Sequence, residues 1–280
     1  MKYRQLSKTL TKFVKAVSRT AIGSAVRTAA KRLFGSTAAQ IITMGNSGAS
    51  PQLRLWRIIS PLSRLISPLY KVYNDSSSSS LRSSLMGSGL DVIKARCPEL
   101  QLEYIAEGED ILAKSRAEND RLILCTGHFG LGLLIFRVIA DYLDERGYRV
   151  CFIVKVFDEI WRVGMRGSVT LSTVGANTFI KARSALETGS IVCVAPDHLT
   201  EEGHEVSTNV FKFAWRLRAS VLFFGSRLDR DGRIVIDFVR PLHHTIKTHN
   251  EAVLCADEFR QFVAKRTGRA LKLRVRPEGL

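Results

Sequence analysis

The chain has 280 residues, of which 45% are hydrophobic and 24% are charged, which is typical of a globular protein with a full core and excludes a disordered chain. Its net charge of +16 is unevenly placed. Thirteen of the 42 lysines and arginines, and no acid, lie in the first 74 residues, which leaves 29 basic residues against all 26 acids in the rest. The N-terminal quarter is therefore expected to meet an anionic partner.

The five cysteines are scattered and form no CxxC pair, so neither a disulfide framework nor a zinc site is indicated. We interpret them as buried thiols in a reducing compartment, the cytoplasm. No secretory signal is evident. The most apolar N-terminal stretch, 53–73, is interrupted by arginines and prolines, and one central arginine costs on the order of 2.5 kcal/mol in a bilayer. We expect peripheral attachment to a membrane.

Basic and apolar side chains alternate along the N-terminal region. In residues 2–34 the apolar side chains recur at three- and four-residue steps, which predicts a basic amphipathic helix. Residues 53–73 form a second basic and apolar segment, with one tryptophan and two tyrosines suited to a membrane–water interface. A serine-rich run follows. We predict a membrane-associating region at 1–74, a linker at 75–90 and an α/β domain at 91–280.

Strand and helix patterns alternate in the C-terminal part of the chain. The predicted strands are 121–126, 149–155, 190–195, 220–225 and 233–239. The predicted helices are 131–145, 158–168, 178–188, 209–218 and about 250–267. This order predicts an α/β fold with a mostly parallel sheet covered by helices on both faces. The last two strands, joined through Asp231 and Gly232, are expected to form a hairpin that ends the sheet.

The most informative motif follows the first of these strands. The apolar run Leu122–Cys125 leads into Gly127, His128, Phe129 and Gly130. The carboxyl end of a strand in an open α/β sheet is where catalytic groups gather, and the glycines allow a substrate to approach closely. A histidine placed there can act as a general base near neutral pH. The alternative is an ordinary turn histidine.

Polar residues also follow the next two strands. Lys155 comes after the second strand, and Asp197 and His198 come after the third. Because parallel strands end at one edge of a sheet, these side chains are expected to converge with His128. Asp197 could supply a carboxylate and His198 a second base; the alternative is a turn in which Asp197 bonds its own backbone. Arg166 is a candidate ligand for phosphate.

Several classes of site lack their signatures. A metal site built from the histidines and the aspartate would have no HExxH or CxxC spacing. The sequence contains no GxSxG elbow, no phosphate-binding P-loop and no GxGxxG fingerprint. It contains no nucleic-acid-binding motif, and the apolar residues interleaved with the N-terminal basic ones favour a lipid surface over nucleic acid.

The order of segments in residues 99–240 resembles the bacterial lipid A late acyltransferases, the lauroyl/myristoyl type within the lysophospholipid-acyltransferase-like superfamily. The matching pieces are the strand and His-Phe-Gly turn at 122–130, the block 185–198 that ends in Val-Ala-Pro-Asp-His, and the helix and strand at 210–221. The basic N-terminal region is similar to the membrane-proximal part of such enzymes. Together these pieces cover about half of the chain.

The resemblance implies transfer of a fatty acyl group from an acyl carrier protein or acyl-CoA thioester to a lipid hydroxyl. It places the protein peripherally at the cytoplasmic face of the inner membrane, with no metal, no dissociable cofactor and no nucleic-acid partner. His128 would be the general base, and Asp197 is the second catalytic candidate. Substrate contacts are expected from Gly127, Phe129, Gly130, Lys155, Arg166 and His198.

One position departs from the family pattern. The family has a histidine, four further residues and then an acid, and Leu133 stands where that acid would be. The missing carboxylate would orient the imidazole and stabilise its charged form. Asp141 is too far away, since a helix rises ~1.5 Å per residue. Either Asp158, Glu159 or Asp197 substitutes, or the activity is weak, or the chain is a catalytically degenerate lipid- or membrane-binding protein on the same fold.

Overall fold

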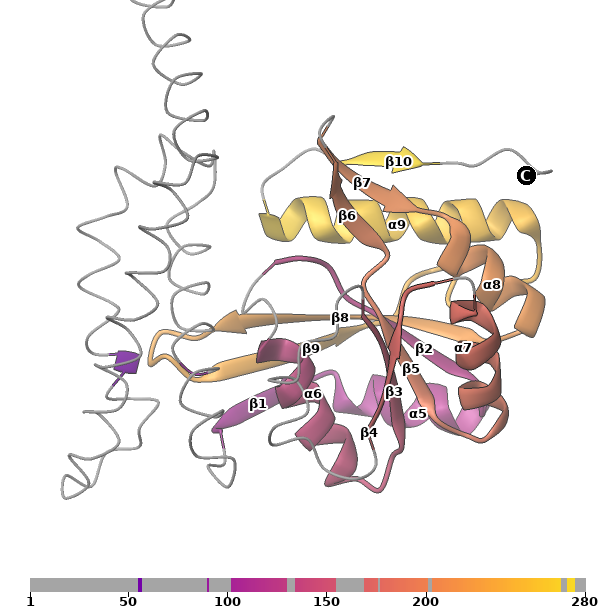
Figure 1. Ribbon diagram of the computed structural model, residues 1–280. Helices are drawn as coiled ribbons and strands as arrows, with labels where there is room; N and C mark the ends of the chain where they lie inside the picture. Colours follow the sequence, from indigo (N-terminus) through magenta and orange to yellow (C-terminus); the bar gives the residue numbers. More distant parts are fainter. Residues whose placement is uncertain are drawn as a thin grey trace, which may run out of the picture.

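In the computed structural model, the residues described are 55–56, 90, 102–129, 134–154, 169–175, 177–200, 203–267 and 271–274. They form an α/β fold in which a seven-stranded, mostly parallel sheet is joined by a three-stranded sheet (Figure 1). The predicted fold class is confirmed. The predicted helix at 158–168 and nearly all of the predicted basic region and linker lie outside the described residues.

The elements follow one another along the chain in this order. The first half contains β1 (Tyr104–Glu107), α5 (Glu109–Glu118), β2 (Leu122–Cys125), α6 (Leu134–Asp144), β3 (Val150–Val154), β4 (Val169–Thr173) and α7 (Thr178–Glu187). The second half contains β5 (Ile191–Val194), β6 (Asp197–Thr200), β7 (Gly203–Ser207), α8 (Asn209–Leu217), β8 (Ser220–Leu228), β9 (Ile234–Val239), α9 (His249–Thr267) and β10 (Lys272–Arg274).

The large sheet has the order β1-β9-β8-β2-β5-β3-β4, and every neighbouring pair is parallel except β8 with β9. Cys125, the last residue of β2, lies opposite Val194 of β5 and Phe223 of β8. Strands β2 and β5 therefore end side by side, while β8 continues past them to Leu228. The segments that leave β2 and β5 consequently meet at one edge of the sheet.

Strand β2 shows why the sheet has a core on each face. Its sequence Leu-Ile-Leu-Cys is fully buried. Leu122 and Leu124 pack into the cluster that contains residues of α5 and α6, whereas Ile123 and Cys125 pack into the cluster that contains residues of α7, α8 and α9. A strand covered on both faces is a continuous apolar run, which is why the sequence pattern predicts β2, β3, β5 and β8.

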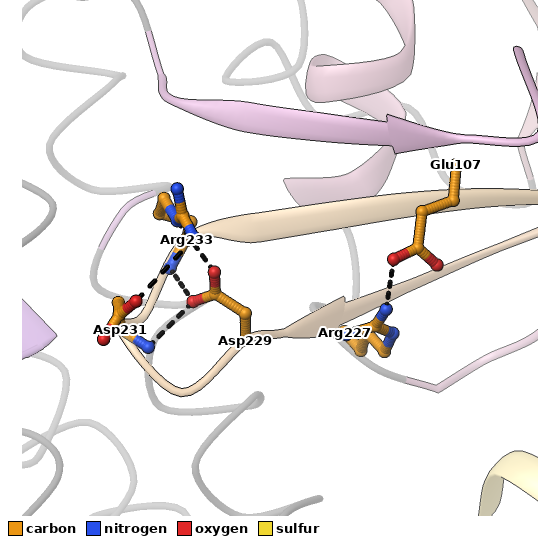
Figure 2. Close-up of polar contacts among 5 residues, drawn as sticks. All are labelled: Glu107, Arg227, Asp229, Asp231 and Arg233. Carbon is orange, nitrogen blue, oxygen red and sulfur yellow. Dashed lines mark hydrogen bonds and ion pairs between the residues drawn. The ribbon is translucent and has the colours of Figure 1, made fainter.

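The β8–β9 hairpin is confirmed, but the expectation that it ends the sheet is wrong. Strand β1 pairs in parallel with β9, with Tyr104 opposite Ile234, and forms the true edge. Only alternate residues of β1 face the core, so its four residues give no apolar run. Arg227 of β8 reaches across β9 to an ion pair with Glu107 of β1 (Figure 2).

The turn of this hairpin contacts the N-terminal region. Asp229 accepts hydrogen bonds from the backbone nitrogens of Asp231 and Arg233, at 2.9 and 2.8 Å (Figure 2). Gly232 has φ +82°, and a Cβ added there would lie 2.3 Å from the ring of Trp56. Leu55, beside that tryptophan, is buried in the same cluster as α5 and α6. Part of the predicted 1–74 region therefore packs on the α/β domain.

Two expectations about the chain's chemistry can be compared with this fold. Cys125, Cys151, Cys193 and Cys255 are free and buried, as predicted. Burial raises the pKa of the Cys125 and Cys193 thiols, so both stay protonated at neutral pH. Over the ranges that the structure describes, no helix combines the length and the apolar character needed to cross a membrane.

Candidate active site

His128 lies at the tip of a tight turn at the carboxyl end of β2. The backbone nitrogen of Thr126 donates to the carbonyl of Val194 at 3.0 Å, which extends the β2–β5 ladder one residue beyond the strands. The backbone nitrogen of Phe129 then donates to the carbonyl of Gly127 at 2.8 Å, closing a three-residue turn around His128. The side chain of His128 is 53% exposed. The structure thus presents this imidazole to solvent at the sheet edge.

Asp197 binds His128 with both of its carboxylate oxygens. Oδ2 accepts a hydrogen bond from the backbone nitrogen of His128 at 2.8 Å, and Oδ1 lies 3.0 Å from Nδ1 of the imidazole. The Asp197 side chain is completely buried. Asp197 is the first residue of β6, which follows β5 along the chain. Because β5 is the neighbour of β2 in the sheet, the strand order brings Asp197 and His128 together. Asp197 therefore stands at the start of a strand and binds the His128 turn, rather than standing in a turn of its own.

This pairing determines how the imidazole can react. When Asp197 is ionised, its Oδ1 can only accept a hydrogen bond from Nδ1–H, and this contact selects the tautomer in which Nε2 is the basic nitrogen. The same carboxylate stabilises the imidazolium that forms when Nε2 takes up a proton. Because a buried carboxylate is costly without partners, the two contacts to His128 also hold the turn in place. In this arrangement the imidazole could serve as a general base and Asp197 could orient it.

Helix α9 forms one wall of the turn. The Phe129 ring packs edge-on against Phe262, with 5.8 Å between the ring centroids. A Cβ at Gly127 would come within 2.7 Å of the Phe129 ring and 2.9 Å of Cγ2 of Val263, which is fully buried on α9. A Cβ at position 127 would therefore force the Phe129 ring and the Val263 side chain to shift.

Gly127→Ala is expected to lower the free energy of unfolding by about 1–3 kcal/mol, because the added methyl group overpacks this contact. Denaturant titration of the purified chain measures the loss. Gly175→Ala is the matched control, since a Cβ there meets nothing within 4 Å. Equal stabilities of the two variants would contradict the tight packing of the turn on α9.

Arg266 forms an ion pair with Asp237 next to the aromatic ring of Phe262. The guanidinium of Arg266 on α9 sits 3.7 Å from the centroid of the Phe262 ring and pairs with Asp237 of β9. Gly225 of β8 makes room for it, because a Cβ there would lie 2.7 Å from Nε of Arg266. Burial lowers the pKa of Arg266 to about 10, so the group remains charged at neutral pH. Sequence reasoning missed this pair; the glycine inside an apolar strand was its only signal.

The structure describes only some of the other predicted site residues. Those outside the described residues are Gly130, Leu133, Lys155, Asp158, Glu159 and Arg166. Gly127 and Phe129 lie in the His128 turn, as described. His198 follows Asp197 in β6, and successive strand residues point to opposite faces. Its Nε2 lies 3.6 Å from Oε2 of Glu205 on β7, so His198 belongs to a different contact.

A second histidine–carboxylate pair repeats the geometry elsewhere. Glu258 of α9 accepts a hydrogen bond from the backbone nitrogen of Leu242 at 2.7 Å, and its other oxygen contacts Nδ1 of His243. This pair lies near the opposite edge of the sheet, because the neighbouring Thr245 bridges to Ser220 at the start of β8. His243 therefore provides a matched control for His128.

Comparison with known proteins adds no assignment. In the part of the chain that the structure describes, no group of three or more histidine, cysteine or acidic side chains could hold a metal ion. No family model matches the chain, and the curated proteins contain no match to its sequence. The function is therefore inferred from the buried carboxylate and the half-exposed imidazole at the carboxyl edge of the sheet.

Proposed function

We propose that this chain is an acyltransferase that moves a fatty acyl group from an acyl carrier protein or acyl-CoA thioester to a lipid hydroxyl at a membrane surface. The observation that carries the proposal is the pairing of a fully buried Asp197 with a half-exposed His128. The resemblance in segment order to the lipid A late acyltransferases supports it. In this chain Asp197 would take the role of the acid that the family has at the position of Leu133.

The proposed reaction needs one base and no change of oxidation state. Nε2 of His128 takes the proton from the acceptor hydroxyl while that oxygen attacks the carbonyl carbon of the thioester. The tetrahedral intermediate then collapses, the C–S bond breaks, and the departing thiolate receives the proton from the imidazolium. The products are an ester and a free thiol. Asp197 stabilises the imidazolium during the interval in which it carries the proton.

Leu133 and the basic N-terminal region favour a second candidate function. A chain that has lost the family's acid could bind lipid on the same fold without turnover. The thirteen basic residues of the first 74 would support such binding, since each one near an anionic leaflet contributes about 1 kcal/mol. Transfer activity separates the two candidates.

The test is an assay of the purified full chain with acyl-CoA donors of different chain length and vesicles that contain hydroxyl lipids. Acyl transfer predicts that free thiol and new lipid ester appear in equal amounts. Thiol release without ester would indicate hydrolysis and would contradict the proposal. Vesicle binding without either product, with acyl carrier protein thioesters also tested, would support the lipid-binding function instead.

A further inference from the structure

Three large apolar side chains are exposed where β4 leads into α7. Val174 is 57% exposed, Phe179 is 43% exposed and Ile180 is 67% exposed. We call these three residues the α7 patch. Exposed apolar side chains that lie close together mark surfaces that contact another apolar surface, whereas single ones need no explanation.

The α7 patch is held in a fixed conformation. Oγ1 of Thr178 accepts a hydrogen bond from the backbone nitrogen of Gly175 at 2.6 Å and donates one to its carbonyl at 2.7 Å. The backbone nitrogen of Val174 still takes part in the ladder with β3. On α7 the Phe179 ring packs against Phe213 of α8, with centroids 4.8 Å apart. A partner that contacts the patch would therefore not have to order it first.

The charge around the α7 patch fits an anionic surface. Lys181 is exposed on α7 directly after the patch, and the first turn of α7 contains no acid. An apolar surface with a basic side chain beside it suits the interface of a bilayer with anionic lipids. Charge complementarity thus favours a membrane over a neutral or basic protein partner.

The α7 patch also begins at the edge of the sheet where the candidate active site lies, the edge formed by the carboxyl ends of the parallel strands. Val174 follows the carboxyl end of β4, and His128 follows the carboxyl end of β2, which runs in the same direction in the order β2-β5-β3-β4 (Figure 1). We propose that the α7 patch inserts into the surface of an anionic bilayer. The α/β domain would then present its catalytic edge to the lipid. This deepens the proposed function, but vesicle binding measures it without any turnover.

Tryptophan scanning tests the contact at the patch itself. Ile180→Trp and Leu242→Trp place an added indole on the patch and on a residue that is 89% exposed near the opposite sheet edge. Both full-length variants are mixed with vesicles of brominated phosphatidylglycerol and phosphatidylcholine. The proposal predicts that the fluorescence added at position 180 is quenched and that added at 242 is not. An unquenched indole at 180 on a vesicle-bound chain overturns it, as does a chain that binds no vesicles.

A charge substitution provides the second arm. Ile180→Asp is expected to weaken vesicle binding about tenfold, which corresponds to about 1.4 kcal/mol, whereas Leu242→Asp leaves it unchanged. Both positions are exposed, so both variants are expected to fold. If Ile180→Asp instead leaves vesicle binding intact and converts a dimer to a monomer in sedimentation, a second copy covers the patch and the proposal is overturned. Because neither arm involves catalysis, an inactive wild-type chain that shows the quenching contradicts only the proposed transfer activity.

Discussion

His128→Ala is expected to lower the turnover of acyl transfer by about four orders of magnitude, the upper end of what a positioned general base contributes. The imidazole is the group that removes the proton from the acceptor hydroxyl in the proposed reaction, and the buried Asp197 commits its Nδ1 to a fixed partner. The half-exposed side chain packs only in part, so the variant is expected to fold. Turnover is measured as lipid ester formed under saturating thioester.

His243→Ala is the control for this prediction. It removes the same side chain from a similar carboxylate contact, but near the opposite edge of the sheet. Turnover of this variant is expected to equal that of the wild-type chain. Equal losses in both variants would show a general effect on folding, and wild-type turnover of His128→Ala would exclude His128 as the base.

Asp197→Asn is expected to lower turnover by about three to four orders of magnitude, as removal of the acid does in Ser-His-Asp triads. The asparagine oxygen can still accept the backbone nitrogen of His128, but its amide group then faces Nδ1 as a donor. That contact favours the tautomer with the proton on Nε2, which can no longer take a proton from the acceptor. The KM for the lipid acceptor is expected to stay near that of the wild-type chain.

Glu258→Gln makes the same change in the His243 pair and is expected to leave turnover unchanged. A measurement of the free energy of unfolding accompanies both variants, because Asp197 is fully buried and its replacement also affects stability. Near wild-type turnover of Asp197→Asn, in a folded chain, would mean that another group orients the base.

The strands that the sequence predicts best are those with continuous apolar runs. The predicted strand 149–155 corresponds to β3, and the predicted helix 178–188 corresponds to α7. The elements that sequence reasoning missed bury little or carry polar residues, such as β1 with one face exposed and β6 with the sequence Asp-His-Leu-Thr. Such segments become strands only because a neighbouring strand supplies hydrogen-bond partners, and local pattern does not reveal that neighbour.

Sequence reasoning also predicted only part of the candidate site. The sequence places His128 and Asp197 at the ends of two strands, and a parallel sheet brings such ends to one edge. It does not say that β2 and β5 are neighbours, so it left three acids as possible partners for the imidazole. The two residues are 69 positions apart, and only the strand order joins them. Arg266 has the sequence context of an ordinary surface residue near a helix end, and only the fold shows it against Phe262.

The most direct test of the central claim is the turnover of the double variant His128→Ala, Asp197→Asn, assayed beside the two single variants. If Asp197 acts on the reaction only through His128, the double variant is no slower than His128→Ala alone, since residues that act as one unit give non-additive losses. A double variant slower by the product of the two single losses would show that the two side chains act independently, and would contradict their assignment as one acid–base pair.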